Sequence, residues 1–553
     1  MINKKYFFLF FFFLGITSSL ISQNESWFFL RANNENINPE FERVDNQLVY
    51  KGKDDKLKRL FFSYKIYEFK KTYQNANKKN LRKTFFVVAN DKQLLEDLLQ
   101  NFSDKFEFGE IISDEDKKIF EPNDYGFTST IGENLGLQAD LSYLDFLGLP
   151  KAWYYTTGSS KTIIGISDAT IDTLNIDFKG KTQTIQKSTM SKGHGSAVAS
   201  IAASQGDNEY GVPGICYDCS IYATQYGNFQ KLEQLIELSN MGVKVINCSW
   251  VGSTYYQTAQ DVIDEMFDNG TIIVAGSGNK GWDITKGKKL YYPASYNHVI
   301  SVSAGMYRYD LVSDNILISD KGNLYAENIK GYVGRTVGFK NNDLKNGHYI
   351  YPVSTTTLNK EVDILAPTTG VLLFNKYILD NKIIYDTNEH TSNTTPFVTG
   401  TIGLLFSLNP CLPIDEVESI IKLTTLNLDK INANKPYQGN YGAGILQIGA
   451  AVKLVYDLFT ETEVATIENQ NFTRWDFKLT AYSKEVVIQN QKFTNESRLS
   501  LTAKNRIVIG KNTVLKPNAI GNITLKIDPT LEKQCDLVLR EGFPNNKYYD
   551  PNN

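Results

Sequence analysis

The strongest constraint on the fold is a series of short, almost wholly apolar segments that alternate with helical segments between residues 137 and 454. Strands that are apolar on both faces are typical of a parallel sheet covered by helices on each side. The intervening segments carry apolar residues at helical spacing. The pattern predicts a doubly wound α/β fold with a mostly parallel sheet. The clearest expected strands are 162–167, 243–248, 271–275 and 299–303, and the clearest helices are 230–241 and 413–426.

The sequence before this pattern contains two further segments, residues 1–22 and residues 23–120. Residues 1–22 have a charged start at Lys4 and Lys5, then an apolar centre, and end with small residues, which is the arrangement of a secretory signal peptide. The alternative, a transmembrane anchor, would need about 20 apolar residues, more than this run offers. Residues 23–120 contain a strand, a helix and a second strand, which predict either a small α+β pro-domain or an ordinary N-terminal subdomain. Turn residues at 121–126 mark the start of the main domain, which we place at 121–458.

Residues 459–553 change in character. Here short strands carry alternating apolar residues, such as Leu499 and Leu501, and are separated by Asn and Gly. A spacing of about ten residues between such runs is typical of an all-β module. The spacing fits either a sandwich or a small solenoid.

Composition narrows the classes of function. The formal net charge of −3 over 553 residues gives no field that would favour nucleic acid or acidic lipid as a partner. Only five cysteines occur, so a large core rather than a disulfide framework must hold the fold. Cys216 and Cys219 form a Cys-Tyr-Asp-Cys segment without the second pair that a zinc site needs. We expect a local disulfide or two free thiols there.

Three residues with complementary chemistry lie where strands end and helices begin. Asp168 directly follows the first expected strand, His194 lies at the start of an Ala-rich helix, and Ser392 precedes a buried helix of small residues. Ligands of open α/β sheets bind at the carboxyl ends of strands, so these junctions should meet. Serine becomes a nucleophile when an imidazole takes its proton, and a carboxylate must orient that imidazole. Only four histidines are present, which narrows the choice of base.

A fourth candidate is Asn279, in the segment Ala-Gly-Ser-Gly-Asn after the strand at 271–275. Its side-chain amide can donate a hydrogen bond to the oxyanion of a tetrahedral intermediate. The glycines beside it let the backbone come close to a ligand. Taken singly, each of the four residues could serve a turn or a helix cap. Their joint occurrence at these junctions favours a catalytic site.

The sequence around these residues resembles the subtilisin family of serine peptidases. Asp-Ala-Thr-Ile-Asp, His-Gly-Ser-Ala-Val-Ala-Ser and Thr-Ser-Asn-Thr-Thr-Pro-Phe-Val-Thr-Gly are similar to the family's motifs around its Asp, His and Ser, in the same order. The resemblance covers roughly residues 137–454. It implies catalytic Asp168, His194 and Ser392, an oxyanion donor at Asn279, and substrate contacts at Ser249, Trp250, Gly252 and Gly278.

Some positions depart from the family pattern or extend it. His390 stands two residues before Ser392 where the family has Gly, and Val251 stands in the expected substrate-binding strand where Gly is usual. Both side chains would change the shape of the cleft. Asp177 and Asn208 match positions that bind calcium in several relatives, and hard oxygen ligands suit Ca²⁺. A structural Ca²⁺ is therefore a candidate, and no cofactor is expected to be required.

The resemblance implies a secreted serine endopeptidase that acts through an acyl-enzyme. We expect protein or peptide substrates, a monomer, an extracellular or cell-envelope location, and no nucleic-acid partner. The segment at 23–120 would act as an intramolecular inhibitor before maturation. Two alternatives remain open: a catalytically impaired pseudo-peptidase that only binds peptide, and a cell-surface adhesion protein that uses the β module at 459–553.

Overall fold

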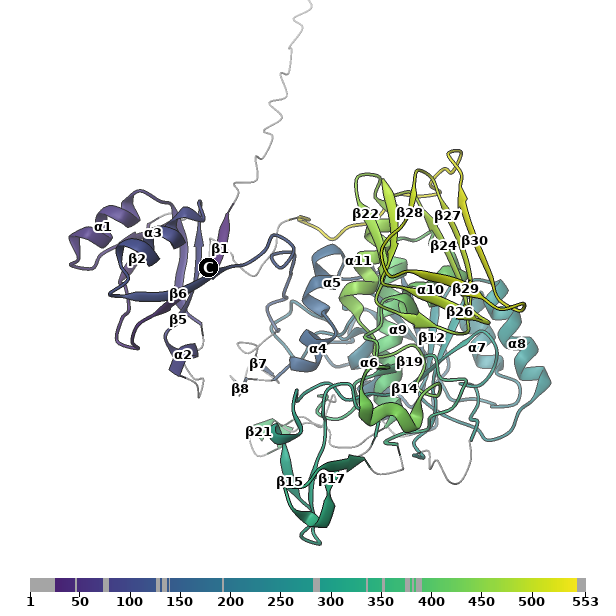
Figure 1. Cartoon of the computed structure of the whole chain (residues 1–553). Helices are drawn as coiled ribbons and strands as arrows, with labels where there is room; N and C mark the ends of the chain where they lie inside the picture. Colours follow the sequence, from purple (N-terminus) through teal and green to yellow (C-terminus); the bar gives the residue numbers. More distant parts are fainter. Residues whose placement is uncertain are drawn as a thin grey trace, which may run out of the picture. The chain divides into compact units, whose positions relative to one another are not determined.

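The computed structural model describes most of the chain and divides it into two compact units, which we describe separately (Figure 1). The first contains the described residues up to Lys118, and the second begins at Ile119. The predicted signal peptide at 1–22 lies outside the described residues. The described residues are 25–44, 47–72, 79–125, 130–131, 137–138, 140–190, 193–281, 289–334, 337–350, 354–372, 378–379, 382–383 and 390–544.

The first unit is an α+β fold built on an antiparallel sheet in the order β4-β5-β1-β6. Its central strand β1 has the sequence SWFFLRA and alternates between the two faces of the sheet. The sequence-based prediction found β5, α3 and β6 but not β1. The elements are β1 (Ser26–Ala32), β2 (Phe41–Val44), β3 (Gln47–Tyr50), α1 (Asp55–Phe62), β4 (Ile66–Lys71), α2 (Lys79–Arg82), β5 (Thr84–Ala89), α3 (Gln93–Asn101) and β6 (Phe106–Ile111).

The second unit is organised around a seven-stranded sheet in which every pair is parallel. Its strand order is β10-β11-β9-β12-β13-β14-β19, so the chain winds outwards in both directions from β9. The predicted doubly wound α/β class is confirmed. The strands are β9 (Ile163–Ser167), β10 (Thr182–Thr184), β11 (Ser220–Thr224), β12 (Val245–Cys248), β13 (Ile272–Gly276), β14 (Val299–Ala304) and β19 (Ile364–Ala366).

Helices cover both faces of this sheet, as the apolar strands require. Along β12, Val245 packs into one core while its neighbour Ile246 packs into the other. One core contains helices α5, α6, α9, α10 and α11, and the other contains α7 and α8. The helices are α4 (Ser142–Phe146), α5 (Leu149–Tyr155), α6 (His194–Ala203), α7 (Glu233–Asn240), α8 (Gln257–Asp268), α9 (Thr391–Leu408), α10 (Ile414–Leu423) and α11 (Ile448–Phe459).

Helix α9 runs through the centre of the second unit. Of its residues, all but Ser392 are buried. It contacts α6, α11 and strands β12, β13 and β14. A helix that is apolar and small all round has to be enclosed in this way. Ser392, at the second position, is therefore the place where this buried helix reaches the surface.

Short strands between β14 and α9 form minor sheets. Four of them make an antiparallel sheet separate from the main one, visible in teal in Figure 1. They are β15 (Ile316–Ile318), β16 (Leu324–Ala326), β17 (Val337–Phe339) and β18 (His348–Ile350). A short antiparallel pair, β20 (Ile378–Leu379) with β21 (Lys382–Ile383), lies in the same part of the chain. Another, β7 (Thr130–Ile131) with β8 (Leu137–Gln138), lies before the strands of the main sheet.

The C-terminal strands wind into a small solenoid of stacked coils. They form three sheets of three parallel strands each, and equivalent residues stack from coil to coil: Phe472 faces Phe493, which faces Leu515. Of the two predicted architectures, the solenoid is the one observed. The strands are β22 (Val464–Glu468), β23 (Asn471–Phe472), β24 (Asp476–Ala481), β25 (Glu485–Gln489), β26 (Lys492–Asn495), β27 (Arg498–Ala503), β28 (Ile507–Ile509), β29 (Val514–Pro517) and β30 (Asn522–Ile527).

The solenoid belongs to the same compact unit as the main sheet. Helix α10 packs on β24, and the segment after β30 returns to the main domain, where the N–H of Val538 donates to the carbonyl of Leu408. Two disulfides are present, Cys216–Cys219 and Cys411–Cys535, of which the sequence had suggested only the first. Among the helices that the structure describes, none combines the length and apolar character that a membrane span requires.

Candidate active site

The candidate residues meet at the carboxyl ends of the parallel strands. Asp168 directly follows β9, Ser249 follows β12, and Asn279 lies three residues after β13. His194 is the first residue of α6 and Ser392 the second residue of α9. The topology therefore delivers them to one edge of the sheet from five separate parts of the chain.

Asp168 and His194 form a hydrogen-bonded pair. The distance between Asp168 Oδ1 and His194 Nδ1 is 2.7 Å. The carboxylate is fully buried, whereas 44% of the His194 side chain is exposed. A buried acceptor at Nδ1 favours the tautomer that carries its proton there, so that Nε2 can act as a base.

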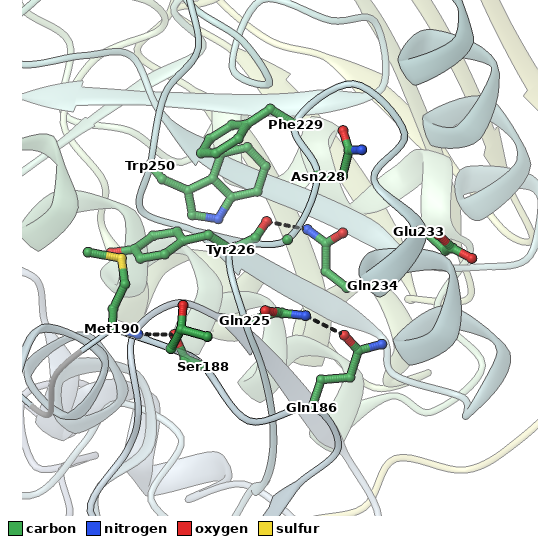
Figure 2. A pocket seen from close by; sticks show the side chains of 12 residues that line it. Gln186, Ser188, Met190, Gln225, Tyr226, Asn228, Phe229, Glu233, Gln234 and Trp250 are labelled. Carbon is green, nitrogen blue, oxygen red and sulfur yellow. Dashed lines mark hydrogen bonds between the residues drawn. The ribbon is translucent and has the colours of Figure 1, made fainter.

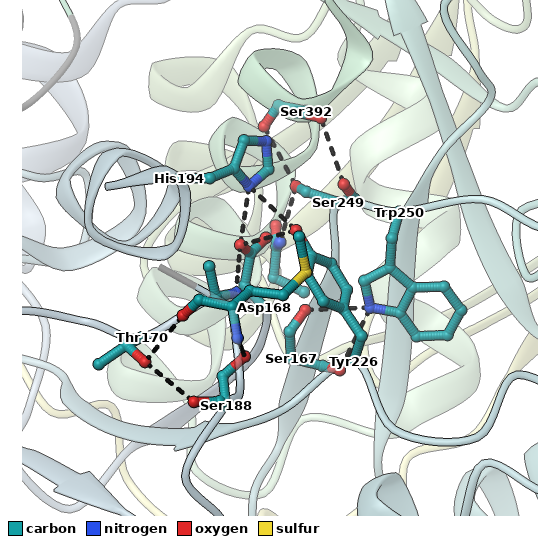
Figure 3. Close-up of polar contacts among 12 residues, drawn as sticks. Ser167, Asp168, Thr170, Ser188, His194, Tyr226, Ser249, Trp250 and Ser392 are labelled. Atoms are coloured by element: carbon teal, nitrogen blue, oxygen red, sulfur yellow. Dashed lines mark hydrogen bonds and ion pairs between the residues drawn. The ribbon is translucent and has the colours of Figure 1, made fainter. Parts of the chain in front are cut away.

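Figure 3 shows the His194 ring lying between Asp168 and Ser392. The Ser392 hydroxyl donates to the carbonyl of Ser249 at 3.2 Å, and the Ser249 hydroxyl donates back to the carbonyl of Ser392 at 3.1 Å. Asn247 fixes this second serine by donating from Nδ2 to Ser249 Oγ at 2.9 Å. The nucleophile candidate is thus held at the start of α9, where the helix dipole favours developing negative charge.

Asn279 is oriented by the first residue of the same helix. Its Oδ1 accepts hydrogen bonds from the backbone N–H of Thr391 at 2.8 Å and from the Thr391 hydroxyl at 2.9 Å. The oxygen end of the amide is therefore occupied, and the NH₂ group is the end left to donate. Asn279 itself is exposed. The geometry suits a fixed donor beside the Ser392 hydroxyl.

The residues expected to contact substrate lie beside Ser392 but differ in what they can offer. Trp250 donates from Nε1 to the carbonyl of Ser167 at 3.0 Å, which fixes its ring against β9. Gly252 pairs with Tyr292 through both its N–H and its carbonyl. Its backbone is therefore already occupied, and pairing with an extended peptide falls to the residues before it.

Gly278 is closely packed. A Cβ atom built there would lie 2.8 Å from Cδ2 of Tyr291. Its φ of 111° is also one that other residues rarely adopt. Glycine is therefore required here for the backbone that leads to Asn279, and Tyr291 packs against it.

A cavity of about 630 Å³ opens next to the Asp168–His194 pair (Figure 2). Trp250 and Phe229 form one wall, with their ring centroids 4.6 Å apart, and Met190 also lines the cavity. Amide and hydroxyl side chains and one carboxylate, that of Glu233, line most of the remainder. A concave site that combines an aromatic wall with polar groups is suited to binding side chains of a ligand.

Tyr226 is the residue in this region that the sequence did not reveal. It lines the cavity, and its hydroxyl donates to Asp168 Oδ1 at 3.2 Å. It lies two residues after β11 in a segment without a recognisable motif. Its position after a strand of the main sheet was the one available signal, because residues that follow β9, β12 and β13 form the site.

Asp177 and Asn208 lie together, away from the triad candidates. Asn208 Nδ2 donates to Asp177 Oδ1 at 2.9 Å, and Asp177 is almost fully buried. Burial raises the pKa of Asp177 to about 7, and the nearby buried carboxyl of Asp124 adds to the effect. Asp124 Oδ2 has no hydrogen-bond partner within the described chain. In the described residues, no group of three or more His, Cys, Asp or Glu side chains is arranged to hold a metal ion.

A family model described as the subtilase family matches residues 159–444, just over half of the chain. The chain belongs to the subtilase family.

Curated relatives agree with this assignment. Subtilisin DY from Bacillus licheniformis is 26% identical over 272 residues, covering 48% of this chain and 79% of its own. The minor extracellular protease Epr from Bacillus subtilis is 33% identical over 267 residues, covering 47% of this chain but only 33% of its own. The solved structure of the prenylagaramide maturation protease PagA is similar over 56% of this chain and 98% of its own, with 21% identity and a TM-score of 0.40. The subtilase family model, subtilisin DY and the Epr protease support a serine protease.

Two positions depart from the subtilase pattern, His390 and Val251, and the structure shows the surroundings of both. The backbone N–H of His390 donates to Thr368 Oγ1 at 3.0 Å, and its carbonyl accepts from the same hydroxyl at 3.0 Å, while the residue is exposed. Val251 is 40% exposed. Both side chains are therefore accessible from solvent.

Proposed function

We propose that this subtilase is a secreted serine endopeptidase with a triad of Asp168, His194 and Ser392. The observation that carries the proposal is the 2.7 Å bond between Asp168 and His194, with Ser392 on the opposite side of the imidazole. His194 takes the proton of Ser392 as the hydroxyl attacks the peptide carbonyl, and later gives it to the leaving amine. Asp168 stays ionised and holds the imidazole in place. Water then hydrolyses the acyl-enzyme.

The amide of Asn279 and the backbone N–H of Ser392 stabilise the oxyanion in this mechanism. Thr391 holds the Asn279 oxygen, so the donor is aimed before substrate arrives. A donor that needs no reorganisation is what makes such sites effective. Substrates are proteins or peptides that lie extended along the segment at 249–251.

The test compares Ser392→Ala with the parent enzyme in casein hydrolysis and in labelling by a fluorophosphonate. Ser253→Ala, which removes another exposed serine from the same region, serves as the matched control. We expect S392A to lose both hydrolysis and labelling and S253A to keep them. Casein hydrolysis at the parental rate by S392A would refute the proposal. A parent that binds peptide but neither hydrolyses nor labels would instead be a pseudo-peptidase.

The relatives suggest where the enzyme acts. Two of them come from Bacillus subtilis: the Epr protease is described as extracellular, and the other as a cell wall-associated protease. Together with the signal-like sequence at 1–22, these descriptions support export of this chain. Fractionation of cells that express the full chain, with activity in the medium or envelope, is the expected result. Activity confined to the cytoplasm would contradict it.

We also propose that Ca²⁺ binds beside Asp177, with Asn208 and Asp124 as further oxygen ligands. Two buried carboxyls lie close together, and the neighbouring Lys181 donates to Gln205 and to the carbonyl of Tyr217. A divalent cation would neutralise the charge that burial leaves uncompensated. We expect EGTA to lower the melting temperature and added CaCl₂ to restore it, with a smaller effect in Asp177→Asn. An unchanged melting temperature would contradict the assignment.

A further inference from the structure

Tyr226 reaches the proposed triad from outside the motifs that define it. Its hydroxyl lies 3.2 Å from Asp168 Oδ1 and 3.5 Å from His194 Nδ1. Figure 3 shows the side chain extending from its loop towards the carboxylate. The inference below rests on the proposed peptidase function and concerns what this contact does for it.

The hydrogen bonds of the Asp168 carboxylate are unevenly distributed. Oδ1 accepts from the backbone N–H of Ala169 at 2.6 Å, from His194 at 2.7 Å and from Tyr226 at 3.2 Å. Oδ2 is buried and has no partner in the part of the chain that the structure describes. Tyr226 is thus the one side chain besides His194 that binds this carboxylate within the described residues. Its hydroxyl donates to Oδ1, the same oxygen that binds the imidazole of His194.

The position of the Tyr226 hydroxyl is fixed by its surroundings. Gln234, which is buried, donates from Nε2 to the carbonyl of Tyr226. The tyrosine ring meets the edge of Trp250, with centroids 6.4 Å apart and the planes at 78°. Trp250 is in turn held by its bond to Ser167. These contacts limit the motion of the ring, so the hydroxyl is a pre-positioned donor.

In the part of the chain that the structure describes, the charge of Asp168 also acts on two other titratable groups, Tyr226 and Cys248. Burial and the charge of Asp168 raise the pKa of Tyr226 well above its ordinary value, so its hydroxyl always carries a proton to donate. The Cys248 thiol, at the end of β12, also faces this charge. Burial raises its pKa, and it remains a thiol. We therefore expect the acidic limb of the pH profile of activity to follow the protonation of His194.

We propose that Tyr226 is a positioning residue that holds the Asp168 carboxylate and, through it, the imidazole of His194. A donor on Oδ1 withdraws negative charge from the oxygen that His194 uses. Without the hydroxyl, the carboxylate is freer to turn, and more of its charge acts on the imidazolium. The charged form of His194 then gains stability, and its pKa rises. The activity should fall, and the acidic limb of its pH profile should move to higher pH.

Tyr226→Phe removes only the hydroxyl and keeps the ring that lines the cavity. We expect kcat to fall about tenfold and KM to stay within about twofold, because the wall of the cavity is unchanged. The acidic limb of the kcat profile should move up by about half a pH unit. The substrate is a quenched fluorescent peptide copied from a cleavage site in casein, assayed between pH 5 and pH 10.

Tyr222→Phe is the matched control, because Tyr222 lies on β11 and its hydroxyl makes no contact with Asp168 in the structure. It should behave like the parent. Equal kcat values and equal acidic limbs in Y226F and the parent would overturn the inference. A rise in KM alone would also overturn it, since that result describes a wall of the cavity and not a positioning residue.

A variant that folds only in part can be tested by labelling Ser392 with a fluorophosphonate at each pH. The labelled fraction of the folded molecules then gives the acidic limb of the pH profile. Failure of the peptidase proposal would be seen in the parent, which would neither cleave casein nor label. Failure of the present inference leaves the parent active and labelled, with Y226F indistinguishable from it. The two failures are therefore separate observations.

Discussion

At the scale of single residues, the amide of Asn279 offers the sharpest test of the chemistry. Its oxygen is held by Thr391, so only the NH₂ group can serve an oxyanion. Asn279→Ala removes that donor, and we expect kcat to fall by about 10²–10³ while KM changes little, as for an interaction made in the transition state. Steady-state kinetics on a defined peptide measure both quantities.

Lys280→Ala is the control for Asn279→Ala, because Lys280 is the adjacent exposed residue. It should leave kcat within about twofold. An N279A enzyme with the parental kcat would mean that the oxyanion is stabilised elsewhere, and the proposed role of Asn279 would be wrong.

The residues that the sequence could predict are those whose place depends on the end of a strand. Asp168 and Asn279 follow strands that are apolar throughout, so their location at the sheet edge followed from the pattern. Tyr226 also follows a strand, but its role depends on how far its ring reaches across the loop, and no spacing encodes that distance. The occupied backbone of Gly252 was hidden for a similar reason, because its partner Tyr292 is remote in sequence.

At the scale of elements, Glu416 couples helix α10 to the solenoid. The side chain is fully buried, and its Oε1 accepts from the hydroxyl of Thr480 in β24 at 2.6 Å. Burial raises the pKa of Glu416 to about 7. The neutral form is thus favoured in the folded state. The stability that the protonated Glu416 contributes is fully present below the ordinary pKa of about 4.5. It is lost as the pH rises through 7, because the buried carboxyl then ionises.

Glu416→Gln keeps the shape and the acceptor but cannot ionise. We expect its melting temperature to match that of the parent at pH 4.5 and to exceed it by a few degrees at pH 8, where ionisation of Glu416 costs about 3 kcal/mol. Calorimetry at pH 4.5, 6 and 8 checks this. Glu496→Gln, which changes an exposed carboxyl, should show no such pH-dependent gain. A constant difference across this range would contradict the assignment.

The elements themselves were predicted best where the apolar period is strongest. Strands β9, β12, β13 and β14 agree with the expected ranges to within two residues. The choice between sandwich and solenoid could not be made, because alternation along a strand does not reveal its partner. Stacking of Leu499 on Ile523 is a pairing between coils, and only the fold displays it.

At the scale of the whole molecule, the Cys411–Cys535 disulfide closes the long segment that contains the solenoid, with a sequence separation of 124. A cross-link over so long a loop restricts the unfolded chain strongly and contributes about 5 kcal/mol in the chain-entropy model. We expect the Cys411→Ser/Cys535→Ser variant to melt at a clearly lower temperature. Cys216→Ser/Cys219→Ser, which opens a loop with a sequence separation of 3, should lose about a third as much. Equal losses in differential scanning calorimetry would contradict the loop-length argument.

The division of the chain at Lys118 and Ile119 leads to a prediction about maturation. The first unit has its own apolar core, which includes Phe28, Phe85 and Leu94, so it can remain folded after the connection is cut. If it is an inhibitory pro-domain, the active enzyme should remove it. We expect the mature parent to have lost the first unit, whereas Ser392→Ala retains it, as mass spectrometry of the two purified proteins would show. A trace of active parent added to the S392A protein should then release the unit in trans. Retention of the first unit by a fully active parent would show instead that residues 25–118 are a permanent domain.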